Sequence, residues 1–128
     1  MIRPDGKVGN DSGNTTYDIS ADCVVANVRS ASDWATIAHE LKHCYQFETG
    51  DLSFASTKDG VGAGKLYDYQ DEVEAHYRGS LFGAPKTPDF ERYKDILGDR
   101  KCKDSVLNCH PGPNEYYLKK GVLYRPVK

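Results

Sequence analysis

The segment TIAHELKHCYQFETG, residues 36–50, constrains the fold more than any other part of the chain. His39 and His43 stand four residues apart, and Glu40 directly follows the first of them. In an α-helix, residues i and i+4 lie on one face about 6 Å apart, so this spacing lets two imidazoles reach one metal ion. Glu40 is then placed to reach a metal-bound water without being a ligand itself. The motif therefore predicts a helix that carries a metal site.

The residues around the motif support a helix. Ser30 and Asp33 resemble a capping box at its start, and Gly50 is well placed to end it. At about 100° per residue, the apolar side chains gather on one side and the two histidines lie on the other. We expect the apolar side to pack into the core and His39 and His43 to face away from it. The apolar side consists of Trp34, Ile37, Ala38, Leu41, Cys44 and Tyr45.

The size and charge of the chain exclude several classes of protein. Its 128 residues suffice for one domain with one core, and 28% charged with 38% hydrophobic residues is a globular composition. A net charge of −2 offers no basic surface to neutralise phosphates, which argues against nucleic acid as a partner. No apolar run approaches the ~20 residues that a membrane span requires.

The remaining segments predict an α+β fold. Residues 1–16 are rich in Gly, Asn, Asp and Ser and are typical of a linker or tether, so that residues 17–128 form the single domain. Further along, the patterns predict a strand at 22–28, a flexible connection at 53–65, helices at 67–81 and 89–97, and a β-hairpin at 115–124. Two central helices would then lie beside a small sheet. The strand at 22–28 is either an interior strand or an edge that pairs with an extended peptide.

Four cysteines are compatible with two disulfides in an oxidising compartment. Cys102 and Cys109 flank a short polar loop and are the better candidates for a bridge. Cys23 and Cys44 either join the strand to the helix or are buried thiols.

A peptidase-type zinc site needs a third protein ligand and leaves the fourth position to water. Gln46 and Thr49 occupy the positions at which metzincins carry Gly and His, so that pattern is absent. Residues 56–59 match an aspartate-ligand pattern only loosely. DEVEAHYRG, residues 71–79, fits better, because it places a glutamate directly before an alanine on a second helix.

HELKH followed by a helix with EVEA resembles a small gluzincin-type zinc metallopeptidase domain, of the kind found in bacterial secreted effectors and polymorphic toxins. The resemblance covers residues 36–79. It implies a zincin-like fold, with an active-site helix and a ligand helix beside a small β-sheet. By the same resemblance His39 and His43 are Zn²⁺ ligands, Glu40 is the general base and Glu74 is the third ligand.

Glu72 is the alternative third ligand. It can also form an ordinary i, i+4 pair with His76, just as Glu74 can with Arg78. Ala75 favours Glu74, because a small residue there lets two helices approach closely.

The resemblance implies a zinc-dependent metalloendopeptidase in which Glu40 takes a proton from the attacking water. A second electrophile would stabilise the oxyanion, and the candidates by residue type are Tyr67, Tyr69, Tyr77, His76 and His110. The substrate would be a protein or peptide, with room for an inhibitor or immunity protein as a partner. No apolar signal segment follows Met1, so we expect the export signal of a secreted or cell-delivered protein to lie upstream in a longer chain.

Two other functions stay open. One is a zinc amidase that acts on a non-protein substrate, such as the cell wall. The other is a non-catalytic domain in which HELKH is a structural zinc site or a coincidence.

Overall fold

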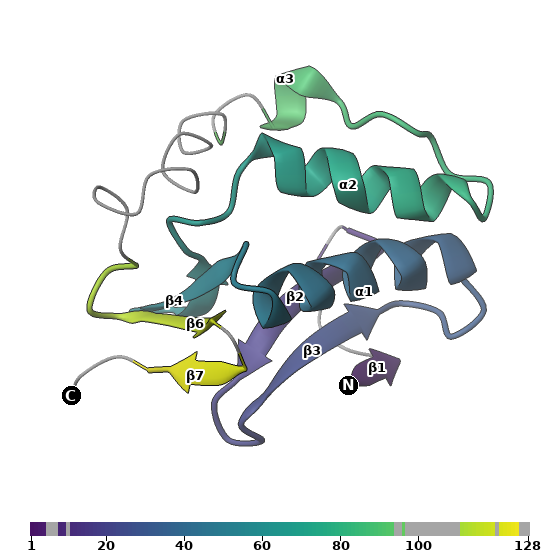
Figure 1. Cartoon of the computed structure of the whole chain (residues 1–128). Coiled ribbons are helices and arrows are strands. Elements are labelled where there is room, and N and C mark those ends of the chain that lie inside the picture. The colour runs from purple at the N-terminus through teal and green to yellow at the C-terminus, as the bar shows by residue number, and fades with distance from the viewer. Residues whose placement is uncertain (5–7, 10, 94–95, 97–110, 120, 126–128) are drawn as a thin grey trace.

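The computed structural model describes residues 1–4, 8–9, 11–93, 96, 111–119 and 121–125. Two packed helices, a three-stranded mixed sheet and a four-stranded antiparallel sheet make up the fold, which confirms the α+β prediction (Figure 1). The elements are β1 (Ile2–Pro4), β2 (Gly13–Asp18), β3 (Cys23–Val28), α1 (Trp34–Glu48), β4 (Ser53–Thr57), β5 (Gly60–Ala63), α2 (Tyr69–Ser80), α3 (Phe90–Tyr93), β6 (Glu115–Lys119) and β7 (Val122–Tyr124).

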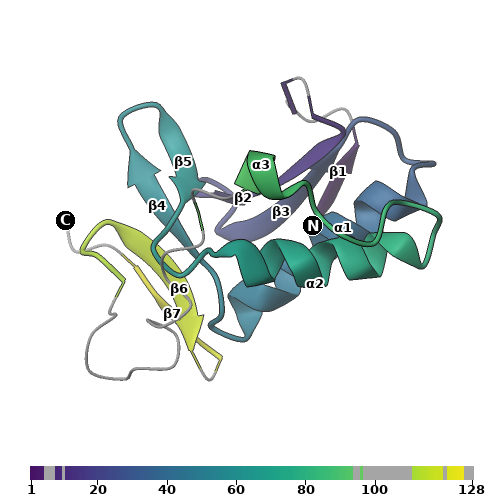
Figure 2. The ribbon, with the colours of Figure 1, turned by 90° about the horizontal axis from the view of Figure 1, so that it is seen from above.

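Helix α1 lies between α2 on one side and the three-stranded sheet on the other (Figure 1). It contacts both β2 and β3 of that sheet. The four-stranded sheet, in the order β5-β4-β6-β7, lies beside the three-stranded one, and the helix pair runs along their flank (Figure 2). Helix α1 is therefore the central element, because α2, β2, β3 and β6 all pack against it.

The predicted strand at 22–28 is confirmed as β3, and it is the interior strand of its sheet. It pairs with β1 in parallel and with β2 in antiparallel orientation. Val25, Ala26 and Val28 are completely buried. The idea that this strand offers an edge to a peptide is therefore wrong, and the long edge strand of this sheet is β2.

Residues 1–16 differ from the loop that their composition predicts, since they contribute β1 and most of β2. The β-branched pair Thr15 and Thr16 stabilises β2 despite the polar residues around it. Gly13 lets β2 approach α1, because a Cβ there would lie 2.7 Å from Thr36 Cγ2 and 3.1 Å from Glu40 Cγ. The glycine-rich, polar composition that is typical of a tether here allows β2 to pack closely against α1.

The predicted flexible connection at 53–65 is also ordered, as the hairpin β4–β5. Gly60 adopts a φ of +130°, which an L-residue rarely reaches, and so permits the turn. Phe54 on β4 is buried and anchors the hairpin. Here the glycines mark a tight turn between strands rather than a mobile segment.

The helix boundaries follow the sequence signals with one change. Asp33 itself is the N-cap of α1 and accepts from the backbone N of Thr36 at 3.1 Å, so the capping pair expected with Ser30 does not form. Gly50 has a φ of +84° just beyond the last turn, as predicted. The second helix is confirmed as α2, and Asp68 and Asp71 form a reciprocal capping box at its start.

The C-terminal part of the chain contains two further predicted elements. The hairpin expected at 115–124 is confirmed as β6–β7. Helix α3 spans Phe90–Tyr93 within the described residues. Cys102, Cys109 and His110 lie outside the described residues.

The apolar side of α1 is only partly buried, since Ile37 and Cys44 are 7% exposed but other members of it are not buried. Trp34, Leu41 and Tyr45 are 63%, 40% and 56% exposed. His43 is instead buried, together with Gln46, against α2. The prediction that the histidines face away from the interior is therefore wrong. Helical periodicity identifies the residues that share a face, but which face is buried depends on the partner, and here α2 presents a polar face of its own.

Small residues let the two helices approach closely. Ala75 of α2 is completely buried. A Cβ on Gly79 would lie 3.2 Å from the backbone oxygen of Ala35 and 3.7 Å from the Cβ of His39. The face of α2 that meets α1 is therefore the one that carries Ala75 and Gly79.

The apolar core lies where the C-terminal part of α1 meets both sheets. It consists of Tyr17, Phe47, Leu52 and Phe54. The ring of Phe47 lies 5.7 Å from that of Tyr17 and 5.2 Å from that of Phe54.

Cys23 and Cys44 are free thiols, so they do not form the bridge that was one of the two alternatives. Burial raises the pKa of Cys44 to about 11, which makes it an unreactive core residue. Within the described residues, no helix combines the length and apolar character needed to cross a bilayer.

Candidate metal centre

A cleft of about 810 Å³ opens between α1, α2 and β2. Thr15 and Asn14 of β2 form one wall, and His39, Glu40 and His43 of α1 form the floor. Glu72 and His76 of α2 also line it, as do Tyr67, Arg92 and Tyr93.

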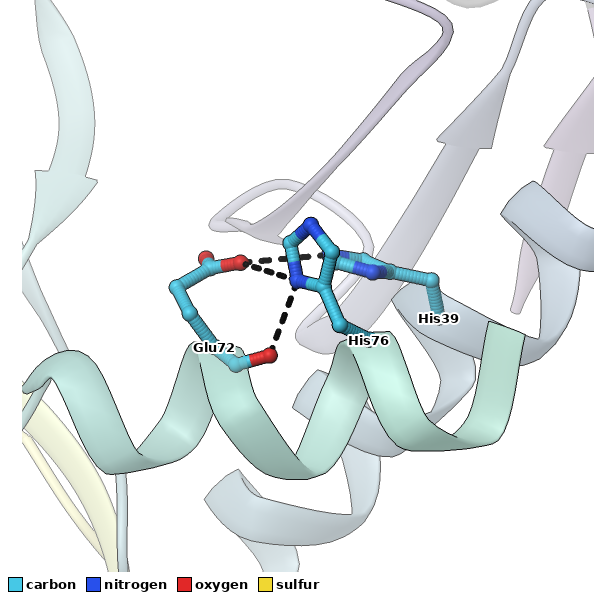
Figure 3. A group of neighbouring side chains, drawn as sticks. All are labelled: His39, Glu72 and His76. Carbon is cyan, nitrogen blue, oxygen red and sulfur yellow. Dashed lines mark hydrogen bonds and ion pairs between the residues drawn. The ribbon is translucent and has the colours of Figure 1, made fainter. Parts of the chain in front are cut away.

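His39, Glu72 and His76 form a group able to hold a metal ion. One ligand atom from each lies within 4.8 Å of the others. The Glu72 carboxylate oxygen Oε2 lies 3.4 Å from His39 Nε2 and 3.4 Å from His76 Nδ1 (Figure 3). His76 Nδ1 is also 2.9 Å from the backbone oxygen of Glu72. Because that carbonyl can only accept, His76 Nδ1 carries a proton, and any coordination would use Nε2.

His43 adds a fourth side chain to this group. Its Nε2 lies 3.2 Å from His39 Nε2 and 3.2 Å from Glu72 Oε1. Burial alone would lower the pKa of His43, but the hydrogen bond and charge of Glu72 outweigh it and raise that pKa to about 9. The Nε2 atoms of the two motif histidines therefore lie next to each other, as the i, i+4 spacing predicts.

The Glu72 carboxylate is the acidic centre of the group. It is 4% exposed, and Oε2 has no hydrogen-bond partner among the described residues. The Tyr67 hydroxyl donates to Oε1. Burial alone would raise the pKa of Glu72, but His39 and His43 overcome it and hold that pKa well below its usual range. Glu72 is thus an ionised carboxylate in the interior.

Glu40 lies at the edge of the group, where a general base is expected. Its Oε1 is 3.9 Å from His39 Nε2, so it is near the histidines without joining them. The Thr15 hydroxyl lies 2.6 Å from Glu40 Oε2 and 3.0 Å from its backbone oxygen. Thr15 therefore fixes the carboxylate from β2, a role that the sequence did not indicate.

Glu74 is not part of the group. Its Oε1 lies 3.4 Å from Gln46 Nε2, and it lines a smaller hollow with Lys42 and Tyr77. At about 100° per residue, Glu72 shares a face with Ala75 and Gly79, which lie three and seven residues further on, whereas Glu74 points well away from that face. The small residues of α2 that face α1 are the sequence signal that favours Glu72 over Glu74 as the neighbour of the two histidines.

Of the predicted oxyanion candidates, Tyr67 and His76 line the cleft. Burial, with Glu72 adding to it, raises the pKa of Tyr67, so its hydroxyl stays protonated and bonded to the carboxylate. Tyr69 and Tyr77 are not among the described residues that line it. Tyr93 also lines the cleft, although the sequence analysis did not single it out; its ring lies 5.8 Å from that of His76.

Comparison of the chain with protein-family models, curated proteins and solved structures finds no match.

Proposed function

We propose that this protein is a zinc-dependent hydrolase, a metallopeptidase whose ligands are His39, His43 and Glu72. The observation that carries the proposal is the close approach of their donor atoms. His43 Nε2 lies 3.2 Å from His39 Nε2 and 3.2 Å from Glu72 Oε1, and the other carboxylate oxygen, Oε2, lies 3.4 Å from His39 Nε2. Atoms bound to tetrahedral zinc at about 2.0–2.1 Å are about 3.3–3.4 Å apart, so the group has the dimensions of a zinc site.

The chemistry of the donors also fits a divalent cation. Two imidazoles and a carboxylate lie close together, with His43 and Glu72 buried and His39 partly buried. Burying an ionised carboxylate costs free energy unless it is paired or coordinated, and Glu72 Oε2 lacks a hydrogen bond among the described residues. A bound ion would satisfy that oxygen and both histidines at once.

The other side chains of the cleft then have defined roles. A zinc ion held by His39, His43 and Glu72 would supply Lewis acidity and would lower the pKa of a bound water to about 7. Glu40, fixed by Thr15, accepts the proton of the attacking water. Tyr67 orients the Glu72 carboxylate through its hydrogen bond. His76 holds its Nδ1 proton against α2, which leaves Nε2 for substrate or ion.

A peptide is the substrate class that the cleft favours. Among the described strands β2 pairs with β3 alone, and its residues Gly13 to Thr15 line the cleft. Its second edge could therefore pair with an extended peptide and present a carbonyl to the site. The zincin-like architecture, the secreted effector context and delivery into a target cell are proposals that rest on the likeness of HELKH and EVEA to that family.

The test measures zinc and hydrolysis together. Purified wild type, Glu72→Ala, Glu74→Ala and Glu40→Gln are assayed for zinc content and for cleavage of unfolded casein and a mixed fluorogenic peptide set. We expect one zinc per wild-type chain, loss of zinc in Glu72→Ala, and retained zinc in Glu74→Ala. Glu40→Gln should keep its zinc and lose hydrolysis by roughly 10²–10⁴-fold.

Three results would overturn parts of the proposal. A zinc-free wild type after metal-replete purification removes the metal site. Zinc lost in Glu74→Ala but kept in Glu72→Ala makes Glu74 the ligand. Unchanged cleavage in Glu40→Gln removes Glu40 as the general base, and bound zinc without any cleavage leaves a structural site. Circular dichroism of each variant separates these results from misfolding.

A further inference from the structure

We propose that Gln46 is a positioning residue that fixes the tautomer and orientation of His43 and ties it to α2; this inference rests on the proposed zinc site. Gln46 lies three residues after His43 and is completely buried. A glutamine without access to solvent has to satisfy both ends of its amide within the protein, and here the two ends face different partners.

The contacts of the amide are well defined. Gln46 Oε1 lies 2.8 Å from His43 Nδ1. Its Nε2 lies 3.1 Å from the backbone oxygen of Asp71 and 3.4 Å from Glu74 Oε1. The side chain therefore bridges the two helices.

These partners determine which way the amide points. The backbone oxygen of Asp71 and the carboxylate of Glu74 are both acceptors only, so they require the NH₂ end of Gln46. The carbonyl end must then face His43. Because a carbonyl only accepts, His43 Nδ1 has to carry a proton and donate it.

The consequence reaches the metal site. With its proton on Nδ1, neutral His43 has its lone pair on Nε2, the nitrogen that lies 3.2 Å from both His39 Nε2 and Glu72 Oε1. Hydrogen bonds of this kind orient metal-binding histidines and raise their basicity. Gln46 also bonds the backbone of Asp71, one residue before Glu72, so it sets the separation of one ligand on each helix.

Glu74 acquires a role in this arrangement without being a ligand. Its carboxylate accepts from the Gln46 NH₂ and helps to hold the amide in the one orientation that serves His43. This role accounts for an acidic residue next to the helix interface that stays outside the ligand group.

The experiment separates the acceptor of Gln46 from its packing. Zinc dissociation constants are measured by competition with a chromophoric chelator for wild type, Gln46→Met and Gln46→Glu, each also made in a Glu74→Gln background to remove charge repulsion at position 74. Both substitutions lose the donor bonds to α2, but only Gln46→Glu keeps an acceptor for His43 Nδ1. We expect Gln46→Met to bind zinc roughly 10–100-fold more weakly and Gln46→Glu with Glu74→Gln to stay within about 3-fold of wild type.

Two further measurements exclude a purely structural role. Long-range ¹H–¹⁵N NMR of zinc-loaded wild type should show a protonated His43 Nδ1, and in Gln46→Met that proton should exchange rapidly with solvent. Phe47→Leu, at the neighbouring core position, is the control that loses stability while its zinc affinity stays within about 3-fold of wild type.

Equal weakening in Gln46→Met and Gln46→Glu, or wild-type affinity with an unchanged His43 spectrum in Gln46→Met, would overturn the inference and leave the zinc site standing. A wild type that binds no zinc would instead remove the proposed function, and the inference with it.

Discussion

Helix α1 contributes to two interiors that are built from opposite materials. At its C-terminal part, Phe47 packs among the aromatic rings of Tyr17 and Phe54. On the face toward α2, its neighbours His43 and Gln46 are just as buried, but they meet Glu72 and the backbone of α2 through polar contacts. Adjacent residues of one helix thus enter a hydrocarbon core and a polar interface.

The difference separates what holds the fold from what needs a ligand. Apolar burial is favourable in proportion to area and needs no partner of defined charge. A buried carboxylate beside two histidines is balanced only by protons or by a cation. The aromatic core should therefore stabilise the protein under all conditions, whereas the polar interface should respond to metal and pH.

The strongest way to break the core is Phe47→Ala. The ring is 2% exposed, so its removal should lower the free energy of unfolding by about 3–5 kcal/mol. The loss should be the same with excess zinc and with a chelator, because the core does not depend on the ion. Guanidinium titrations followed by circular dichroism measure it. A loss that is seen only in the presence of zinc would show that the two interiors are not separate.

The polar interface should reveal itself through pH in the metal-free protein. The pKa of His43 is raised from 6.5 to about 9, so its stabilising contribution is fully present below about pH 6.5 and disappears as the pH rises through about 9. The free energy of unfolding should fall by up to about 3 kcal/mol over this range. If the proposed zinc ion binds His43, it would displace the proton, and the fall should vanish in the zinc-loaded protein.

Urea titrations at several pH values, with His43→Gln as the control that lacks the titrating group, test this. An equally steep fall in His43→Gln would assign it to other residues.

The close packing of β2 against α1 can be tested by replacing two glycines, Gly13 and Gly62, one at a time. In Gly13→Ala the new Cβ would meet Thr36 Cγ2 at 2.7 Å and the backbone oxygen of Asn27 at 2.9 Å, so we expect a loss of about 1–3 kcal/mol. Hydrolysis should fall as well, since the strand carries Thr15 and presses on Glu40. Gly62→Ala is the matched control, because its Cβ would find only Thr57 Cγ2 at 3.9 Å. Thermal unfolding of both variants should separate them clearly.

The sequence predicted the helices and the histidine pair because those features are local. Capping residues such as Asp68, the i, i+4 spacing of His39 and His43, and the terminating Gly50 act within one or two turns. The strands of residues 1–16 and 53–65 were missed, because pairing with distant strands stabilises them against their composition.

The proposed third ligand shows the limit of the sequence analysis most clearly. Whether Glu72 or Glu74 meets the histidines depends on how the two helices dock, and only Ala75 and Gly79 carry a trace of that docking in the sequence. The same docking buries His43 against expectation and leaves Trp34, Leu41 and Tyr45 of the apolar side exposed. The role of Gln46 could not be predicted, since it depends on contacts with Asp71 and Glu74 of α2, 25 and 28 residues away, as well as on the local contact with His43.

The smallest effect expected concerns the start of α2, where Asp68 caps the helix that presents Glu72. Its carboxylate accepts from the backbone N of Asp71 at 3.1 Å, and the carboxylate of Asp71 accepts from the backbone N of Asp68 at 2.9 Å. Asp68→Ala removes one half of this box and should cost about 1 kcal/mol of stability. Zinc affinity should change by less than about 3-fold, because Gln46 and Tyr67 still hold the two ends of the ligand set. Chelator competition alongside thermal unfolding measures both quantities. A large loss of zinc with a small loss of stability would mean that the cap, rather than Gln46, sets the position of α2 against α1.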